Sequence, residues 1–186
     1  MAAEIKTKTS AIRADFGRVY AQTSYRGALR KTIHSLCQPG FQAVAGYRFT
    51  RWLMKHHIPI IGAIVQRLVE VWTGISIPPE TVIGPGLLIH HFGGIVINGS
   101  AKLGSFCTLH HGVTIGNRIS GGPSPVIGDR VLIGVGAAVL GGITVGDDAE
   151  IGANAVILKP VPEGGIAVGI PARVVRIKSN RTEASS

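Results

Sequence analysis

The stretch "VIGDRVLIGVGAAVLGGITVGDDAEIGANAVIL", residues 126–158, repeats one pattern every six residues. Each repeat contains one large aliphatic residue, and the series is Ile127, Ile133, Val139, Val145, Ile151 and Ile157. An α-helix has a period of about 3.6 residues and a strand a period of about 2, so neither element explains this spacing. A period of six is typical of a parallel β-helix, in which three hexapeptides form one triangular coil of about 18 residues.

The same spacing extends toward the N-terminus and predicts the bounds of the β-helix. Aliphatic residues lie six apart from Ile77 to Ile95 and, after a shift of two residues, from Ile97 to Ile115. Glycine often follows the aliphatic residue, which is compatible with tight corners. We therefore expect a β-helix domain over residues 74–178.

The cysteines and the absence of targeting signals indicate a cytoplasmic protein. Cys107 occupies the small inward position of its hexapeptide, so we expect a buried and chemically inert thiol. With Cys37 it forms neither a disulfide framework nor a metal-knuckle spacing. The first residues lack the apolar core of a signal peptide, and no apolar run approaches the roughly 20 residues of a membrane-spanning helix.

Residues 1–73 have a different, helical pattern. The segment FQAVAGYRFTRWLMKHH, residues 41–57, alternates apolar and basic residues at helical spacing. The segment IIGAIVQRLVEVW, residues 60–72, predicts one more helix, largely buried. Residues 179–186 are polar and predict a C-terminal tail.

The positive charge belongs to this N-terminal region. Residues 1–73 contain 11 Lys and Arg against 3 Asp and Glu, whereas residues 74–186 contain 8 against 7. A basic helical region is compatible with peripheral contact at the inner face of a membrane, with a protein partner, or with a solvated helix face. No zinc-finger, RNA-binding or basic-zipper signature accompanies the charge, so we expect no nucleic-acid partner.

Two pairs of histidines stand out in the apolar region. His90-His91 and His110-His111 each follow an aliphatic residue, and the pairs are 20 residues apart, one coil plus the shift of two. We expect them to stack on one edge of the prism, facing outward. Imidazole suits a general base near neutral pH. A metal site is the other reading, but adjacent residues of a strand point to opposite sides, so we expect no metal.

Three segments resemble the serine acetyltransferase-like branch of the hexapeptide acyltransferases. They are IHHFGGIVIN (89–98), HHGVTIGNR (110–118) and ILKPVPEGGIAVGIPARVV (157–175). Within that branch the first two are most similar to O-acetyltransferases of exopolysaccharide synthesis, of the colanic-acid type. The resemblance implies an acetyl-CoA-dependent acyltransferase with a left-handed β-helix, a homotrimer, and acetyl-CoA bound in the groove between neighbouring chains.

The resemblance also implies roles for individual residues. The family's catalytic histidine corresponds to His91, the proposed base for the acceptor hydroxyl, with His111 as a second catalytic candidate. The group that orients His91 stays open between Glu80, His111 and a neighbouring chain. The cofactor-binding positions of the family correspond to Gly116, Asn117, Ala137, Ala155, Lys159 and Arg173.

The chain departs from the serine acetyltransferases at the acceptor site. Carboxylates correspond to His90 and Ser76 here, and an Arg-His pair corresponds to Pro123 and Ser124, within a predicted loop at 117–125. We therefore expect an uncharged acceptor contacted by His90, His110, Ser76 and Ser124. The sequence thus predicts acetyl transfer to a sugar hydroxyl of a cell-surface glycan.

The alternatives are L-serine O-acetylation as in cysteine biosynthesis, a metal-dependent enzyme of the γ-carbonic-anhydrase kind, and a non-catalytic scaffold.

Overall fold

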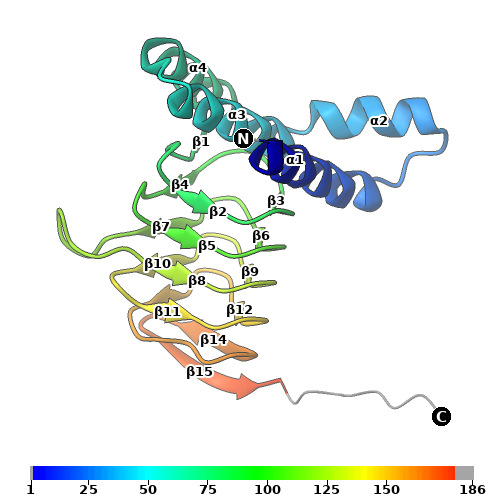
Figure 1. Cartoon of the computed structure of the whole chain (residues 1–186). Coiled ribbons are helices and arrows are strands. Elements are labelled where there is room, and N and C mark those ends of the chain that lie inside the picture. Colours follow the sequence, from blue (N-terminus) through cyan, green and yellow to red (C-terminus); the bar gives the residue numbers. More distant parts are fainter. Residues whose placement is uncertain (1, 179–186) are drawn as a thin grey trace.

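The computed structural model describes residues 2–178, with side chains from residue 11 onward, and the predicted tail at 179–186 lies outside the described residues. Within this part, four helices precede a left-handed parallel β-helix (Figure 1). The predicted fold class, mainly β with a helical N-terminal region, is confirmed.

Short strands stack into three faces of a prism. The first face contains β1 (Ile75–Ser76), β4 (Ile95–Ile97), β7 (Thr114–Gly116), β10 (Ala138–Leu140) and β13 (Val156–Ile157). The second contains β2 (Val82–Ile83), β5 (Lys102–Leu103), β8 (Val126–Ile127) and β11 (Thr144–Val145). The third contains β3 (Leu88–Ile89), β6 (Thr108–Leu109), β9 (Leu132–Ile133), β12 (Glu150–Ile151), β14 (Gly165–Gly169) and β15 (Ala172–Ile177).

The repeated aliphatic residues form the core of the prism. All six aliphatic residues of the 126–158 stretch are at most 2% exposed. Parallel pairing sets Leu109 beside Ile133 and Ile115 beside Val139, so equivalent positions of successive coils stack. Burial of a large aliphatic side chain contributes about 1.5 to 3 kcal/mol, so this stacked series stabilises the prism.

The three corners of the prism carry different chemistry. The histidine corner joins the third face to the first and includes residues 90–94 and 110–113. The loop corner joins the first face to the second and includes residues 117–125, which leave the prism as predicted. The aspartate corner joins the second face to the third and includes residues 128–131 and 146–149.

The helices are α1 (Ala2–Gln22), α2 (Ala28–Cys37), α3 (Pro39–Lys55) and α4 (Pro59–Thr73). Proline is the first residue of α3 and of α4, a position where its missing N–H is not needed. Gly74 ends α4 in the left-handed conformation, and its N–H donates to the Glu70 carbonyl at 2.8 Å. Figure 1 shows these helices over the first coil.

Three arginines of the basic region bind the first coils of the prism. Arg18 donates to the carbonyls of Gly86, Phe106 and Cys107 at 2.8 to 3.0 Å. Arg48 donates to those of Ile83 and Gly84, and Arg51 to those of Pro79 and Thr81. The side chain of Asp15, fully buried, accepts from Arg48 and from the N–H groups of Gly86 and Leu87. Part of the N-terminal charge is therefore structural.

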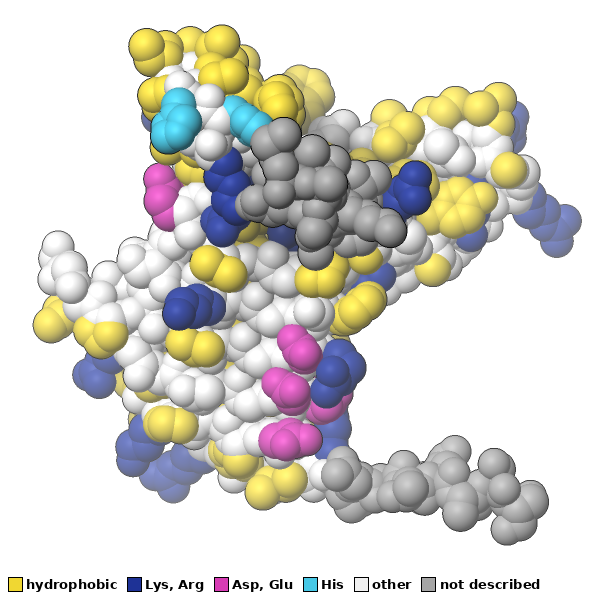
Figure 2. Space-filling model, in the orientation of Figure 1, with side chains coloured by type: hydrophobic (Ala, Val, Ile, Leu, Met, Phe, Trp, Pro, Cys, Tyr) yellow, Lys and Arg dark blue, Asp and Glu magenta, His cyan; other side chains and the backbone are white. Residues whose placement is uncertain are grey.

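The prediction that α4 is largely buried is wrong. Ile60 is 76% exposed, Leu68 64% and Trp72 73%, and apolar side chains cover this helix in Figure 2. The helix packs on α3, where Val69 lies against Gly46, and it also contacts β1, but most of its large apolar side chains stay exposed. Among residues 2–178, no helix is long and apolar enough to cross a membrane.

Candidate active site

The two histidine pairs lie one coil above the other. Strand β3 pairs with β6 so that Ile89 lies beside Leu109. One histidine pair directly follows each of these two residues. The rings of His90 and His110 stack with centroids 4.9 Å apart, and the ring of His111 meets that of His91 edge-on at 5.4 Å. The expected stack of outward-facing histidines is what the structure shows.

His91 sits in the tightest part of this corner. Its φ of 68° is unusual for a residue with a side chain. Gly93 and Gly94 follow with φ of 75° and 73°, and a Cβ on Gly94 would lie 3.3 Å from the Gly112 Cα. This sharp turn leaves His91 exposed, whereas the other three histidines are half-buried. Of the four imidazoles at this corner, the one that is exposed to solvent is thus the predicted base.

The environment favours the neutral form of two imidazoles at this corner, those of His90 and His110. Burial lowers the pKa of His90, and the neighbouring His110 and His91 lower it further. Burial also lowers the pKa of His110, with His91 and His111 as further causes. Nδ1 of His111 is buried and has no hydrogen-bond partner among the described residues. A neutral imidazole has an acceptor nitrogen, so this corner can accept a proton.

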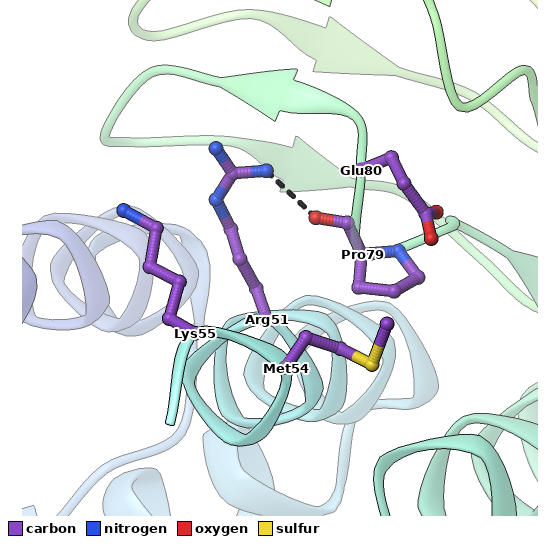
Figure 3. A pocket seen from close by; sticks show the side chains of 5 residues that line it. All are labelled: Arg51, Met54, Lys55, Pro79 and Glu80. Carbon is purple, nitrogen blue, oxygen red and sulfur yellow. Dashed lines mark hydrogen bonds between the residues drawn. The ribbon is translucent and has the colours of Figure 1, made fainter. Parts of the chain in front are cut away.

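Of the groups considered for orienting His91, the structure excludes Glu80 within one chain. Glu80 lies at the loop corner, beside a cavity of about 300 Å³ that Arg51, Met54, Lys55 and Pro79 also line (Figure 3). His111 contacts His91 directly. Within one chain, His111 is therefore the candidate that the geometry retains.

The hydroxyl of Ser76 is hydrogen-bonded to the carboxylate of Glu70. Ser76 lies on β1, on the first face, and its Oγ donates to Glu70 Oε1 at 2.8 Å. Gln66 and Arg67, on the same helix α4 as Glu70, also donate to this carboxylate. Sequence reasoning missed Glu70. The only signal was its place one turn before the glycine that ends the helix.

Ser124 lies at another corner from the histidines. Its Oγ donates to Asn98 Oδ1 at 3.0 Å and contacts Asn117 Oδ1 at the loop corner. One chain therefore does not bring Ser124 together with His90 and His110.

The cofactor candidates divide into two groups. Lys159 and Arg173 line a cavity of about 450 Å³, together with Arg118, which sequence reasoning did not select. Gly116 and Asn117 precede this arginine at the end of β7, and nothing within 4 Å would meet a Cβ on Gly116.

The side chains of Ala137 and Ala155 cannot contact a cofactor. Both are 0% exposed because they fill the inward position of their hexapeptides. Their carbonyls accept hydrogen bonds from the N–H groups of Thr114 and Ala138. Only backbone atoms of these alanines remain as possible contacts.

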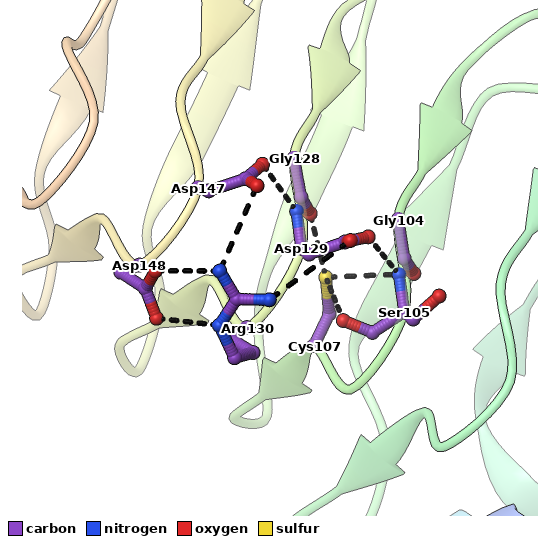
Figure 4. A network of polar contacts seen from close by, with 8 residues as sticks. All are labelled: Gly104, Ser105, Cys107, Gly128, Asp129, Arg130, Asp147 and Asp148. Carbon is purple, nitrogen blue, oxygen red and sulfur yellow. Dashed lines mark hydrogen bonds and ion pairs between the residues drawn. The ribbon is translucent and has the colours of Figure 1, made fainter.

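The aspartate corner is a network of paired charges (Figure 4). Arg130 donates to both carboxylate oxygens of Asp148, at 2.7 and 2.6 Å. Cys107 lies inside this corner, 0% exposed, and burial raises its pKa to about 11. The prediction of a buried thiol is confirmed, and its raised pKa disfavours a thiolate nucleophile.

Among the described residues, no group of three or more His, Cys, Asp or Glu side chains is placed to hold a metal ion.

Comparison with known proteins matches the chain to a transferase family and to proteins named serine acetyltransferase. The family model for the bacterial transferase hexapeptide (six repeats) matches residues 124–159. The serine acetyltransferase of Mycobacterium tuberculosis is 42% identical over 75% of this chain and 62% of its own length. That of Helicobacter pylori is 42% identical over 75% of this chain and 83% of its own. The match covers 58% of the length of the Synechococcus elongatus serine acetyltransferase. The chain therefore spans only about three fifths of the length of this relative and of the M. tuberculosis relative.

Solved structures agree. Neisseria gonorrhoeae serine acetyltransferase in complex with serine has a TM-score of 0.82 and 30% identity, over 90% of this chain and 69% of that one. Brucella abortus serine acetyltransferase in complex with coenzyme A has a TM-score of 0.83 and 31% identity, over 91% and 68%. The predictions of a hexapeptide acyltransferase and of acetyl-CoA as co-substrate agree with these names.

The prediction of a sugar acceptor is wrong. The relatives and solved structures are named serine acetyltransferases, and the resemblance to exopolysaccharide enzymes finds no support. The physical reason lies partly at Ser76. Its replacement of an aspartate was read as a lost negative charge, but Glu70 holds a carboxylate on the Ser76 hydroxyl. Residue types at single positions did not reveal a charge that another element supplies.

Proposed function

The chain belongs to the serine acetyltransferase family, and on this premise we propose that it transfers the acetyl group of acetyl-CoA to the hydroxyl of L-serine. The observation that carries the proposal is the match over nine tenths of the chain to a serine acetyltransferase solved with serine. The histidine corner supplies a base suited to the reaction, and Glu70 supplies a carboxylate at Ser76.

The proposed base is His91. It accepts the proton of the serine hydroxyl while that oxygen attacks the acetyl carbon, so that a C–O bond forms and the C–S bond of the thioester breaks. The imidazolium then returns the proton to the departing thiolate, and O-acetyl-L-serine and coenzyme A leave. Direct transfer needs no acyl-enzyme when both reactants are held together. The buried Cys107, with its raised pKa, is compatible with direct transfer.

We propose that the active site is shared between chains of a homotrimer. His91 lies at the histidine corner, whereas Arg118 and Lys159 of the cavity follow β7 and β13 at the loop corner, on the other side of the first face; Arg173, on β15, completes the cavity from the third face. The two sets of groups meet if the histidine corner of one prism lies opposite the loop corner of the next, and three such contacts close a ring. Sedimentation should show a trimer at micromolar concentration; a monomer that is fully active would contradict the shared site.

The acceptor is tested by offering acetyl-CoA with each of L-serine, D-serine, L-threonine and an oligosaccharide, and identifying products by mass spectrometry. We expect L-serine to give O-acetyl-L-serine at the highest kcat/KM. L-threonine should react less well, because its extra methyl group must fit a site built for serine. No acetylated amino acid, with coenzyme A released on another acceptor, would overturn the proposal.

A further inference from the structure

We infer that Arg118 is a third cation for the phosphates of acetyl-CoA, and that it reaches their site by crossing one coil over Gly141. This inference rests on the proposed function, because the ligand is the co-substrate of that reaction. Arg118 lines the 450 Å³ cavity with Lys159 and Arg173, although the three residues are far apart in the sequence.

The path of the Arg118 side chain is set by the repeat. Arg118 follows β7, whereas Lys159 follows β13, and β10 lies between these two strands on the first face. A long side chain must therefore cross the turn after β10. That turn begins with Gly141, and a Cβ there would lie 3.0 Å from Arg118 Cδ and 3.1 Å from Cγ. The missing side chain at residue 141 leaves room for the arginine stem.

The backbone favours glycine at this position for a second reason. Gly141 has a φ of 93°, a conformation that residues with side chains rarely adopt. Its N–H donates to the Gly116 carbonyl at 2.8 Å, which ties the crossing point to the strand that precedes Arg118. Next to it, a Cβ on Gly142 would lie 2.7 Å from Pro123, so the 117–125 loop also rests on this turn. The turn therefore borders the stem of Arg118 and also supports the loop that contains this residue.

The lining of the cavity is suited to a polyanion. The described residues that line it include three cations and no carboxylate. The remainder is mostly apolar and includes Ile157, Pro160 and Pro171. Coenzyme A carries a pyrophosphate and a further phosphate at its nucleotide end, and guanidinium groups bind phosphate oxygens through paired hydrogen bonds. The cations thus lie where the charged end of the co-substrate needs them, away from the histidine corner.

The test compares the binding of coenzyme A by Arg118→Gln and by the wild type, using titration calorimetry at low and high salt without serine. Loss of a charge-assisted contact should weaken binding about tenfold to a hundredfold. It should also make the affinity less sensitive to salt, because one screened charge pair is gone. Arg118→Lys should restore part of the affinity.

The matched control is Arg176→Gln, an exposed arginine of β15 that does not line the cavity. We expect wild-type affinity and salt dependence for this control. Wild-type binding by Arg118→Gln, or weaker binding with an unchanged salt dependence, would overturn the role of Arg118. If the wild type binds no coenzyme A, the proposed function itself fails. If it binds coenzyme A but acetylates no serine, only the assigned acceptor fails.

Discussion

The histidine corner and the aspartate corner are built by the same repeat but are opposite in character. Both place polar side chains at equivalent positions of successive coils, a few ångströms apart. At the aspartate corner, Arg130 pairs with Asp129, Asp147 and Asp148, so each of these charged groups has a partner of opposite charge. At the histidine corner, four groups of one kind face one another.

The partners at the aspartate corner show what a structural cluster requires. Asp129 accepts from the Ser105 N–H at 2.6 Å, and Asp147 accepts from the Asp129 N–H at 2.8 Å. Arg130 then pairs with Asp148, and Lys178 pairs with Glu150 at 2.8 Å. These bonds connect one coil to the next, and Figure 2 shows the acidic and basic side chains gathered together.

The histidine corner lacks such compensation. Burial, and then the neighbouring histidines, lower the pKa of His90 and of His110, and Nδ1 of His111 is without a partner among the described residues. Perturbed groups that do not satisfy one another are typical of functional sites. A cluster of polar side chains at a corner of the coil can therefore be structural or chemical. What distinguishes the two is whether its groups have hydrogen-bond and ion-pair partners within the chain.

The largest effect among the supporting residues is expected at His111. His111→Ala should lower kcat about 10-fold to 10²-fold, because the ring that meets His91 edge-on no longer positions it. KM for acetyl-CoA should change little, and His111→Gln should recover part of kcat. Steady-state kinetics of both variants check this. An unchanged kcat in His111→Ala would remove His111 from the site.

The two corners should also differ in their response to pH. The pKa of His110 is lowered from an ordinary value of 6.5, so the unfolded chain binds more protons than the folded chain just below that pH. This contribution to stability is complete above pH 6.5 and is lost as the pH falls through the lower folded value. At the aspartate corner, Arg130 lowers the pKa of Asp148 from 3.8, so its contribution is lost only in stronger acid.

Urea unfolding at about pH 7.5 and about pH 5.5 measures this difference, because histidine is the side chain whose ordinary pKa lies in that window. The wild type should be less stable at the lower pH, and His110→Gln should lose less stability between the two. Asp148→Asn should keep the wild-type difference. An equal loss in the wild type and in His110→Gln would contradict the lowered pKa.

The smallest effect is expected at Arg130. Arg130→Gln removes ion pairs that are exposed to solvent, and such pairs contribute little to stability. We expect a small decrease in Tm that shrinks further in high salt, with unchanged turnover. Thermal unfolding and the acetyl-transfer assay check both statements. A variant with intact Tm and lost turnover would show that the aspartate corner takes part in the chemistry.

The spacing of Ile127 and its equivalents predicted the core because burial of a periodic side chain is a local property of the repeat. The stacking of His90 on His110 followed from the same spacing. Glu70 could not be found in this way, because its contact with Ser76 depends on how α4 packs on the first coil.

Other outcomes also depended on packing that periodicity does not contain. The pattern at residues 60–72 predicted an apolar helix, but whether something covers it depends on neighbours outside the segment. Ala137 and Ala155 were assigned to cofactor binding because they correspond to cofactor-binding positions of the family. Their side chains point inward because they occupy the inward position of the hexapeptide. The basic N-terminal region was expected to meet a membrane, a protein partner or solvent, yet Arg18 and Arg48 in it bind carbonyls of the first coils. Long side chains reach targets that no sequence period specifies.

The most direct test is the rate of O-acetyl-L-serine formation from acetyl-CoA and L-serine by the wild type and by His91→Ala, with coenzyme A affinity measured on the same samples. The wild type should form the ester. His91→Ala should be slower by a factor of about 10² to 10⁴, which is typical for loss of a general base. Its coenzyme A affinity should be unchanged, because His91 does not line the cavity of Arg118, Lys159 and Arg173. Ester formation by His91→Ala at the wild-type rate would contradict the assignment of the base to the histidine corner.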